Sequence, residues 1–438
     1  MKKVLAILLT LAMALSLVAC GGAKEEPAKT DEPAKTEEPA KTETPATEGE
    51  NVIKAGLVFP LSGGSGSPGQ INVWAITDYF NYVNENGGIK SLGGAKIVWD
   101  TRDTEGAADI AVTATEALIA DESVSFLMGT YNSGTMSAVQ PVAAKYKMPM
   151  MGVNSVGSYC YVTENECVAH VVSTDQQDYF GLVEFYKALH NEYGVNTVYL
   201  CADNSELSTN NMIMWDEAFA EANIEIVGTE TFNANASDFS TTVQKIKAAD
   251  PDFLVMQGGV NDAILLTQTL DEYGVDCLMW GQGAGFTDPT YLEAVGDLAT
   301  GMTASGYYFS SALPAAGNPE LAKYFADLHE SERGMKVNEP WAVGLTAAMV
   351  MVDALERAGS TDRDAIAKAL METNIPEDAD ANMLWNYPGG IHFEDFECRN
   401  GDFVYNQNPE GSFMVAQYLD GEFMTVYPPA VAVMDVQF

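Results

Sequence analysis

Short apolar runs that alternate with amphipathic segments are the feature that most constrains how this chain can fold. From residue 51, the runs "NVIKAGLVF", "AKIVWD", "VSFLMG" and "PMMGV" are separated by segments with apolar residues at helical spacing, such as "QINVWAITDYFNYVNENGG". Strands that alternate with helices in this way indicate a parallel sheet with helices on both faces. The folded part of the chain is therefore predicted to open with an α/β unit.

The same alternation begins again after residue 172, with strand-like runs "NTVYLCA", "IEIVGTETF", "DFLVMQ" and "DCLMW". A helix-rich region follows, and the last part of the chain returns to strands with the hairpin signal "LDGEF". The folded region of about 390 residues is longer than one hydrophobic core usually covers. We therefore predict an α/β fold of two Rossmann-like lobes, each a parallel sheet flanked by helices.

The first fifty residues have a different character. Two lysines precede an apolar run that ends in "LVAC", which predicts a secretory signal peptide over residues 1–20. "LVAC" also resembles the lipobox of bacterial lipoproteins, which implies lipidation of Cys20; the alternative is an ordinary signal peptide with a chance cysteine. Residues 21–50 repeat "EPAKT" and lack Val, Ile, Leu and aromatic residues, so we predict a disordered tether.

The charge balance excludes nucleic acid as a partner. The chain carries 22 Lys+Arg against 62 Asp+Glu, a net charge of −40, which repels a polyanion and either favours cationic or zwitterionic ligands or serves solubility. No C-x-x-C spacing or close pair of histidines suggests a metal site, and no cofactor is predicted. Cys160 and Cys167 could form a small surface disulfide or remain two thiols.

A glycine-rich loop follows the first predicted strand. Gly64, Gly66 and Gly69 have the G-x-G-x-x-G spacing of dinucleotide-binding loops. However, "PLSG" separates them from the strand, and Pro68 removes one backbone N–H donor. We expect these glycines to let the chain bend tightly and approach a small solute, beside a helix that begins near Gln70 and favours a carboxylate.

Several stretches, in order, carry a family resemblance. They include "IKAGLVFPLSGGSGSPG", "FLMGTYNSGTMSAVQPVAAKYKMPMMGVNS" and "VAQYLDGEFMTVYPP". The chain resembles the branched-chain amino-acid-binding family of ABC-transporter solute receptors, over most of residues 51–438. This resemblance implies a type I periplasmic binding fold whose lobes are joined by three crossover segments. We predict one lobe from 51–172 plus 305–390 and the other from 173–304 plus 391–438.

Candidate ligand contacts lie in loops that follow the predicted strands. In the resembled family, the serine that matches Ser133 binds the ligand carboxylate, and hydroxyl and amide groups follow the strand "PMM". The predicted ligand-binding residues are Ser62, Ser65, Asn132, Ser133, Thr135, Asn154, Ser155, Glu206, Asn261, Asp262 and Gln282.

The second half departs from the family pattern. The amino-acid receptors have an aromatic residue after the strand matching "TVYLCAD", where this chain has residues 204–207, "NSEL". They also have an acid that pairs with the ligand ammonium, where this chain has Gln282. Either Glu206 or Asp262 replaces the missing charge, or the ligand lacks an ammonium group, as an amide, a urea-like solute or a carboxylate would.

The resemblance implies a function without catalysis. We expect a monomeric solute-binding lipoprotein at the outer face of the bacterial cell membrane, held there by its lipid anchor alone. It would capture a branched-chain or related amino acid, amide or small carboxylate and deliver it to the permease and ATPase subunits of an ABC importer. The absence of G-x-S-x-G and H-E-x-x-H patterns argues against an enzyme. The alternatives are a ligand-sensing ectodomain partner on the same fold and an exported enzyme.

Overall fold

The computed structural model describes residues 51–376, 379, 384, 390–410, 413–429 and 431–437. The predicted signal peptide, Cys20 and the tether lie outside these residues. No helix within the described ranges combines the length and apolar character needed to cross a bilayer.

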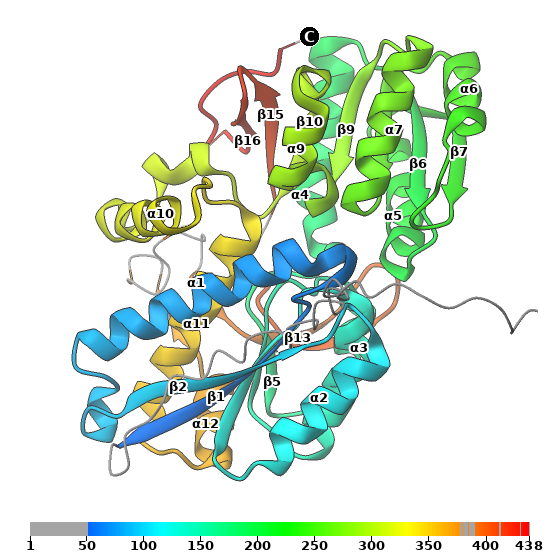
Figure 1. The fold of residues 1–438 in the computed structure, drawn as a ribbon. Helices are drawn as coiled ribbons and strands as arrows, with labels where there is room; N and C mark the ends of the chain where they lie inside the picture. The colour runs from blue at the N-terminus through cyan, green and yellow to red at the C-terminus, as the bar shows by residue number, and fades with distance from the viewer. Residues whose placement is uncertain are drawn as a thin grey trace, which may run out of the picture. The chain divides into compact units, whose positions relative to one another are not determined.

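The first of two large sheets holds the strands of the first predicted unit. Its order β13-β14-β5-β4-β3-β1-β2 is parallel from β14 to β2, and β13 runs antiparallel to β14 (Figure 1). The strands are β1 (Val52–Phe59), β2 (Lys96–Asp103), β3 (Val124–Gly129), β4 (Met150–Gly152), β5 (Val168–His170), β13 (Glu394–Glu397) and β14 (Phe403–Gln407).

The second sheet repeats this arrangement. Its order is β16-β15-β10-β9-β8-β6-β7, so β7-β6-β8-β9-β10 follows the same 2-1-3-4-5 pattern as β2-β1-β3-β4-β5. β15 runs antiparallel to both of its neighbours. The strands are β6 (Thr197–Asp203), β7 (Glu225–Phe232), β8 (Phe253–Gln257), β9 (Leu278–Gln282), β10 (Thr303–Gly306), β15 (Met414–Leu419) and β16 (Glu422–Tyr427). A separate two-stranded sheet pairs β11 (Asn374–Ile375) with β12 (Ile391–His392).

Helices connect the parallel strands, as the alternating pattern predicts. In the first unit α1 packs on α11 and α2 on α3; in the second, α4 packs on α5 and α6 on α7 (Figure 1). The helices are α1 (Gly66–Glu85), α2 (Ala108–Ala120), α3 (Ser133–Lys145), α4 (Asp175–Tyr193), α5 (Glu206–Glu221), α6 (Ser240–Ala249), α7 (Val260–Tyr273), α8 (Ala284–Thr287), α9 (Pro289–Val295), α10 (Pro319–Arg333), α11 (Glu339–Ala358) and α12 (Arg363–Met371). The predicted fold class is confirmed.

The chain passes between the two sheets three times. It leaves the first sheet after β5, returns to it after β10, and passes to the second again between β14 and β15. The predicted second lobe includes residues 394–407, but these residues pair in the first sheet and not the second. Gln407 joins β5 at His170, both in the backbone ladder and through its side chain, which lies 2.9 Å from the imidazole Nδ1.

The glycine-rich loop differs from its prediction in where the helix begins. Helix α1 starts at Gly66, not near Gln70, so two of the glycines lie in its first turn. Pro68 is tolerated there, because the first N–H groups of a helix have no intrahelical acceptor. A Cβ on Gly69 would lie 1.9 Å from the carbonyl oxygen of Pro60. Glycine is therefore needed for close packing of the helix start on the loop after β1.

Cys160 and Cys167 lie in the protein interior, with exposed fractions of 1% and 3%. Cys167 carries a free thiol in the described part of the chain, so the structure holds the second of the two alternatives and not a bridge. Burial raises the pKa of the Cys167 thiol to about 11. The sulfur of Cys160 lies 3.1 Å from the backbone carbonyl oxygen of Ser133, at the start of α3.

Candidate functional site

A cavity of about 410 Å³ lies where the carboxyl ends of both sheets meet. In each sheet the first strand has the second on one side and the third on the other, and this reversal opens a crevice beyond the strand ends. Loops after β1, β3 and β4 line the cavity from the first sheet, and loops after β6, β8 and β9 line it from the second. Small-molecule sites in α/β proteins occur at this place.

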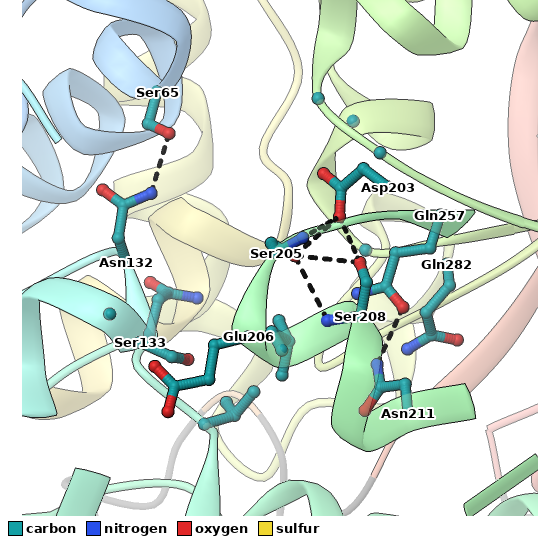
Figure 2. Close-up of a pocket in the computed structure, with 18 of the residues that line it drawn as sticks. Ser65, Asn132, Ser133, Asp203, Ser205, Glu206, Ser208, Asn211, Gln257 and Gln282 are labelled. Carbon is teal, nitrogen blue, oxygen red and sulfur yellow. Dashed lines mark hydrogen bonds between the residues drawn. The ribbon is translucent and has the colours of Figure 1, made fainter. Parts of the chain in front are cut away.

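Three predicted residues from the first unit lie together on one side of the cavity (Figure 2). The amide nitrogen of Asn132 donates to Ser65 Oγ at 2.8 Å, and Asn132 Oδ1 is buried with no partner among the described residues. Ser133, the first residue of α3, accepts a hydrogen bond from the backbone N–H of Gly157 at 3.2 Å. The hydroxyl proton of Ser133 therefore remains available to a ligand acceptor.

Two further predicted residues line the cavity but have most of their hydrogen bonds inside the protein. Thr135 Oγ1 donates to the carbonyl oxygen of Asn132 at 2.7 Å and lies 2.9 Å from Thr130 Oγ1. Asn154 Oδ1 accepts from Asn72 Nδ2 at 2.6 Å, and its amide group faces the carboxylate of Glu339 at 3.4 Å. Both residues shape the wall of the cavity more than they offer free polar groups.

The second unit contributes a hydrogen-bonded group at the end of β6 (Figure 2). The Oδ1 atom of Asp203 accepts from the backbone N–H of Ser205 at 3.1 Å and from its hydroxyl at 2.6 Å. The hydroxyl of Ser208 also donates to this oxygen. This arrangement fixes the start of α5, where the predicted residue Glu206 lines the cavity.

The floor of the second unit carries two glutamines at the ends of strands. Asn211 donates to Gln257 Oε1 at 2.9 Å, and Asn211 Oδ1 is buried without a partner among the described residues. The predicted residue Gln282 accepts from Trp280 Nε1 at 2.9 Å and from Ser305 Oγ at 2.7 Å. Because its oxygen is turned to these partners, the amide nitrogen of Gln282 is the group available to a ligand.

Glu339 is a cavity residue that the sequence analysis missed. It begins α11, on the segment that returns the chain to the first unit. Its Oε2 accepts a hydrogen bond from the backbone N–H of Tyr307 at 2.8 Å. Burial raises the pKa of the Glu339 carboxyl to about 7, and the Tyr307 and Asn154 hydrogen bonds oppose that rise. The sequence "NEP" around Glu339 signals only a helix start, so no local pattern places this acid in the site.

Other missed residues had a detectable signal. Asp203 and Gln257 are the last residues of their strands, and polar residues at carboxyl ends of parallel strands point to a site.

Four predicted residues lie away from the cavity. Ser62 is exposed and donates to Asp103 at 2.7 Å, and Ser155 is buried against Thr130.

The other two lie on the second unit. Asn261 is exposed, while Asp262 is buried and accepts from the backbone N–H groups of Asn235 and Ala236 at 2.9 and 2.8 Å. Asp262 therefore fixes a loop and does not supply a charge to the cavity. Across the described residues, no group of three or more His, Cys, Asp and Glu side chains could hold a metal ion.

Comparisons with known proteins agree with this fold. The family model described as "Periplasmic binding protein" matches residues 52–388. A Leu/Ile/Val-binding protein homolog 8 from Brucella abortus is 24% identical over 399 residues, covering 88% of this chain and 93% of that protein. A Leu/Ile/Val-binding protein homolog 7 from Brucella suis is 23% identical over 395 residues, covering 88% of this chain and 94% of the relative.

Solved structures share the fold. A leucine-binding protein from Thermotoga maritima superposes with a TM-score of 0.70 at 22% identity, covering 85% of this chain and 97% of that one. A solute-binding protein from Rhodopseudomonas palustris in complex with benzoate gives a TM-score of 0.69 at 18% identity, covering 88% and 98%. With two matching sheets, three crossovers and a family match over most of the folded chain, this protein belongs to the periplasmic binding protein family, among relatives of the Leu/Ile/Val-binding proteins.

Proposed function

We propose that this protein is the extracytoplasmic solute receptor of an ABC importer. It captures a small polar solute between its two lobes and delivers that solute unchanged to a membrane permease. The observation that carries this proposal is a single cavity lined by fixed polar groups from the carboxyl ends of two separate sheets. A ligand that contacts both sheets favours the closed arrangement over the open one, which couples binding to a change in the outer surface.

The roles of individual residues follow from their hydrogen bonds. Ser133 and the free N–H groups at the start of α3 suit an anionic or carbonyl oxygen of the ligand. Gln282 and Glu206 contact the ligand from the second unit. Binding in the micromolar range needs about 8 kcal/mol net, which a few hydrogen bonds in a water-excluded cavity supply together with apolar contact.

The known relatives support this class of function. Structures of the same fold include a branched-chain amino acid transporter substrate-binding protein in complex with isoleucine and ABC transporter solute-binding proteins in complex with benzoate or 4-hydroxybenzoate. These ligands are small, and each would fit a cavity of about 410 Å³.

Mass spectrometry of the compound that co-purifies with the protein tests the proposal directly. The expected result is a small solute, retained in stoichiometric amount and recovered unaltered after incubation. Small-angle scattering should show a more compact particle when that solute is added. A chemically changed product would show an enzyme, and the proposal would then be abandoned.

The membrane attachment needs its own test. We propose that Cys20 is lipidated and that residues 21–50 act as the tether. Cys20→Ala should move the protein from the membrane fraction to the soluble extracytoplasmic fraction without changing solute affinity. Retention of the Cys20→Ala protein in the membrane fraction would contradict the proposal that a lipid on Cys20 is its membrane anchor. It would leave the proposed solute-binding function untouched.

A further inference from the structure

The charged residues that line the cavity are all acidic. They are Asp203, Glu206 and Glu339, and among the described lining residues there is no Lys, Arg or His. Asp203 is the most internally compensated of the three, since one of its oxygens accepts three hydrogen bonds from Ser205 and Ser208. The whole chain has a net charge of −40, which adds a long-range attraction for cations. The electrostatics of the cavity therefore disfavour a ligand whose only charge is negative.

Glu339 has fewer hydrogen bonds than Asp203 and is less exposed to solvent than Glu206. Its carboxylate has one short partner, the Tyr307 N–H at 2.8 Å, and one long partner, Asn154 Nδ2 at 3.4 Å. No Lys, Arg or His lies within ion-pairing distance of Glu339 in the described part of the chain. A partly buried carboxylate without a cation beside it is destabilised by desolvation, and a cationic ligand would reduce that cost.

The effect of this carboxylate extends to its neighbours. Burial, together with the carboxylates of Glu339 and Asp288, raises the pKa of the Tyr131 phenol well above its usual range. Tyr131 lines the same cavity. The ring therefore lies in a region of negative potential.

Two unpartnered amide oxygens add to the negative character of the cavity wall. Asn132 Oδ1 and Asn211 Oδ1 belong to residues on opposite sides of the cavity and have no partner among the described residues. Neither oxygen is accessible from the cavity in this conformation, so each contributes partial negative charge to the wall and not a direct ligand contact.

Aromatic rings complete the wall. The aromatic side chains that line the cavity are Tyr131, Tyr159, Tyr186, Trp215, Tyr307 and Phe413. The ring centroids of Tyr307 and Phe413 lie 4.3 Å apart, and the backbone N–H of Tyr307 donates to the carboxylate of Glu339. Aromatic faces attract organic cations as well as apolar groups.

We propose that the ligand carries an ammonium-type cation, that Glu339 binds it, and that this acid from the interlobe crossover replaces the acid missing at Gln282. The inference rests on the proposed solute-binding function and names the ligand class for the same cavity. It separates this protein from receptors of benzoate-type anions. Glu206, at the start of α5, adds a second negative charge from the opposite unit.

Two matched sets of three compounds test the charge requirement. The first is leucine, 3-methylbutylamine and 4-methylpentanoate; the second is phenylalanine, phenethylamine and 3-phenylpropanoate. Within each set the side chain is constant, while the ammonium or carboxylate group is removed. Thermal shift and titration calorimetry are measured on the wild-type protein after removal of any co-purified solute, and on Glu339→Gln. Glu330→Gln, at an exposed position on α10, is the matched control.

The expected result is that, in at least one set, an ammonium-bearing member binds tenfold or more tightly than the carboxylate-only member. Glu339→Gln should weaken that ammonium-bearing member at least tenfold, with Glu330→Gln unchanged. Equal or tighter binding of the carboxylate-only member, or unchanged affinity in Glu339→Gln, overturns the inference. So does a lack of response to every ammonium-bearing probe. Benzoate and small amides are run in parallel, because binding of these alone would leave the proposed receptor function intact.

Discussion

The carboxylate of Glu339 accepts a hydrogen bond of 2.8 Å from the backbone N–H of Tyr307. Tyr307 follows β10 of the second sheet, and Glu339 opens α11, which packs on α1 of the first unit. This bond lies on the crossover between the lobes, and the same carboxylate lines the cavity. A ligand that binds Glu339 would therefore contact a segment that connects the two sheets.

The pH dependence of ligand binding follows from this carboxyl. Burial raises the pKa of the Glu339 carboxyl to about 7, so this carboxyl is mostly protonated below that pH when no ligand is bound. An ammonium ligand favours the ionised form, and its affinity should fall as the pH decreases below 7, approaching about tenfold per pH unit. Calorimetry with the best amine probe from pH 8 to pH 5.5 measures this slope. Glu339→Gln should bind the probe more weakly, with an affinity that does not change over the same pH range. If the substitution left the pH dependence of the affinity unchanged, that would contradict the assignment.

Ser133→Ala should weaken solute binding about tenfold or more, from the loss of roughly 1 to 3 kcal/mol of hydrogen bonding. The hydroxyl accepts from the N–H of Gly157, so its proton is the part offered to the ligand. Ser137→Ala, at a partly exposed position on the same helix that does not line the cavity, is the matched control. Titration calorimetry checks both variants, and equal affinity in the two would remove Ser133 from the site.

Gly69→Ala should destabilise the ligand-free protein by about 1 to 3 kcal/mol, because overpacking forces the backbone to shift. The added Cβ would lie 1.9 Å from the Pro60 carbonyl oxygen. Gly134→Ala is the control, since nothing lies within 4 Å of its Cβ position and alanine gains up to about 1 kcal/mol in a helix. Urea unfolding of the two variants should move the midpoint in opposite directions. A stable Gly69→Ala protein would show that α1 does not need this close approach.

Acid should destabilise the fold through His170. Burial lowers the pKa of its imidazole to about 4, while the unfolded chain titrates near 6.5. Between these values the unfolded state binds more protons, so stability is lost as the pH falls from about 6.5 to about 4, by up to about 3 kcal/mol. His170→Gln should reduce the slope of unfolding free energy against pH in this window, with His392→Gln as the partly exposed control.

Other buried groups titrate in the same window as His170. Burial lowers the pKa of His329 to about 4, which adds to the slope, whereas burial raises the pKa of Glu339 to about 7 and that of Asp78 to about 6, which opposes it. The contribution of His170 is therefore the difference in slope between the wild-type protein and His170→Gln, and no difference would show that its burial has no effect on stability.

Local patterns were enough to predict most of the elements. The predicted helix-rich region holds α10, α11 and α12, and "LDGEF" predicted the turn between β15 and β16, where Asp420 and Gly421 have φ of 51° and 85°. The predicted residues Ser65, Asn132 and Ser133, between β1 and α1 or β3 and the start of α3, and Gln282 at the end of β9 do line the cavity. Each of these features depends on residues that are close in the chain, where periodicity and turn chemistry act directly.

The sequence by itself therefore determined two α/β units, their helices and the strand ends from which a site is built. Tertiary structure alone decided that β14 pairs with β5 in the first sheet, that Asp262 fixes a loop, and that Glu339 faces the cavity. These outcomes join residues that are far apart in the sequence or follow from which side chains pack together, and no local pattern records such a choice. The charge of the site was set in this way, because the acid at the start of α11 became part of the cavity wall only when the crossover segments came together.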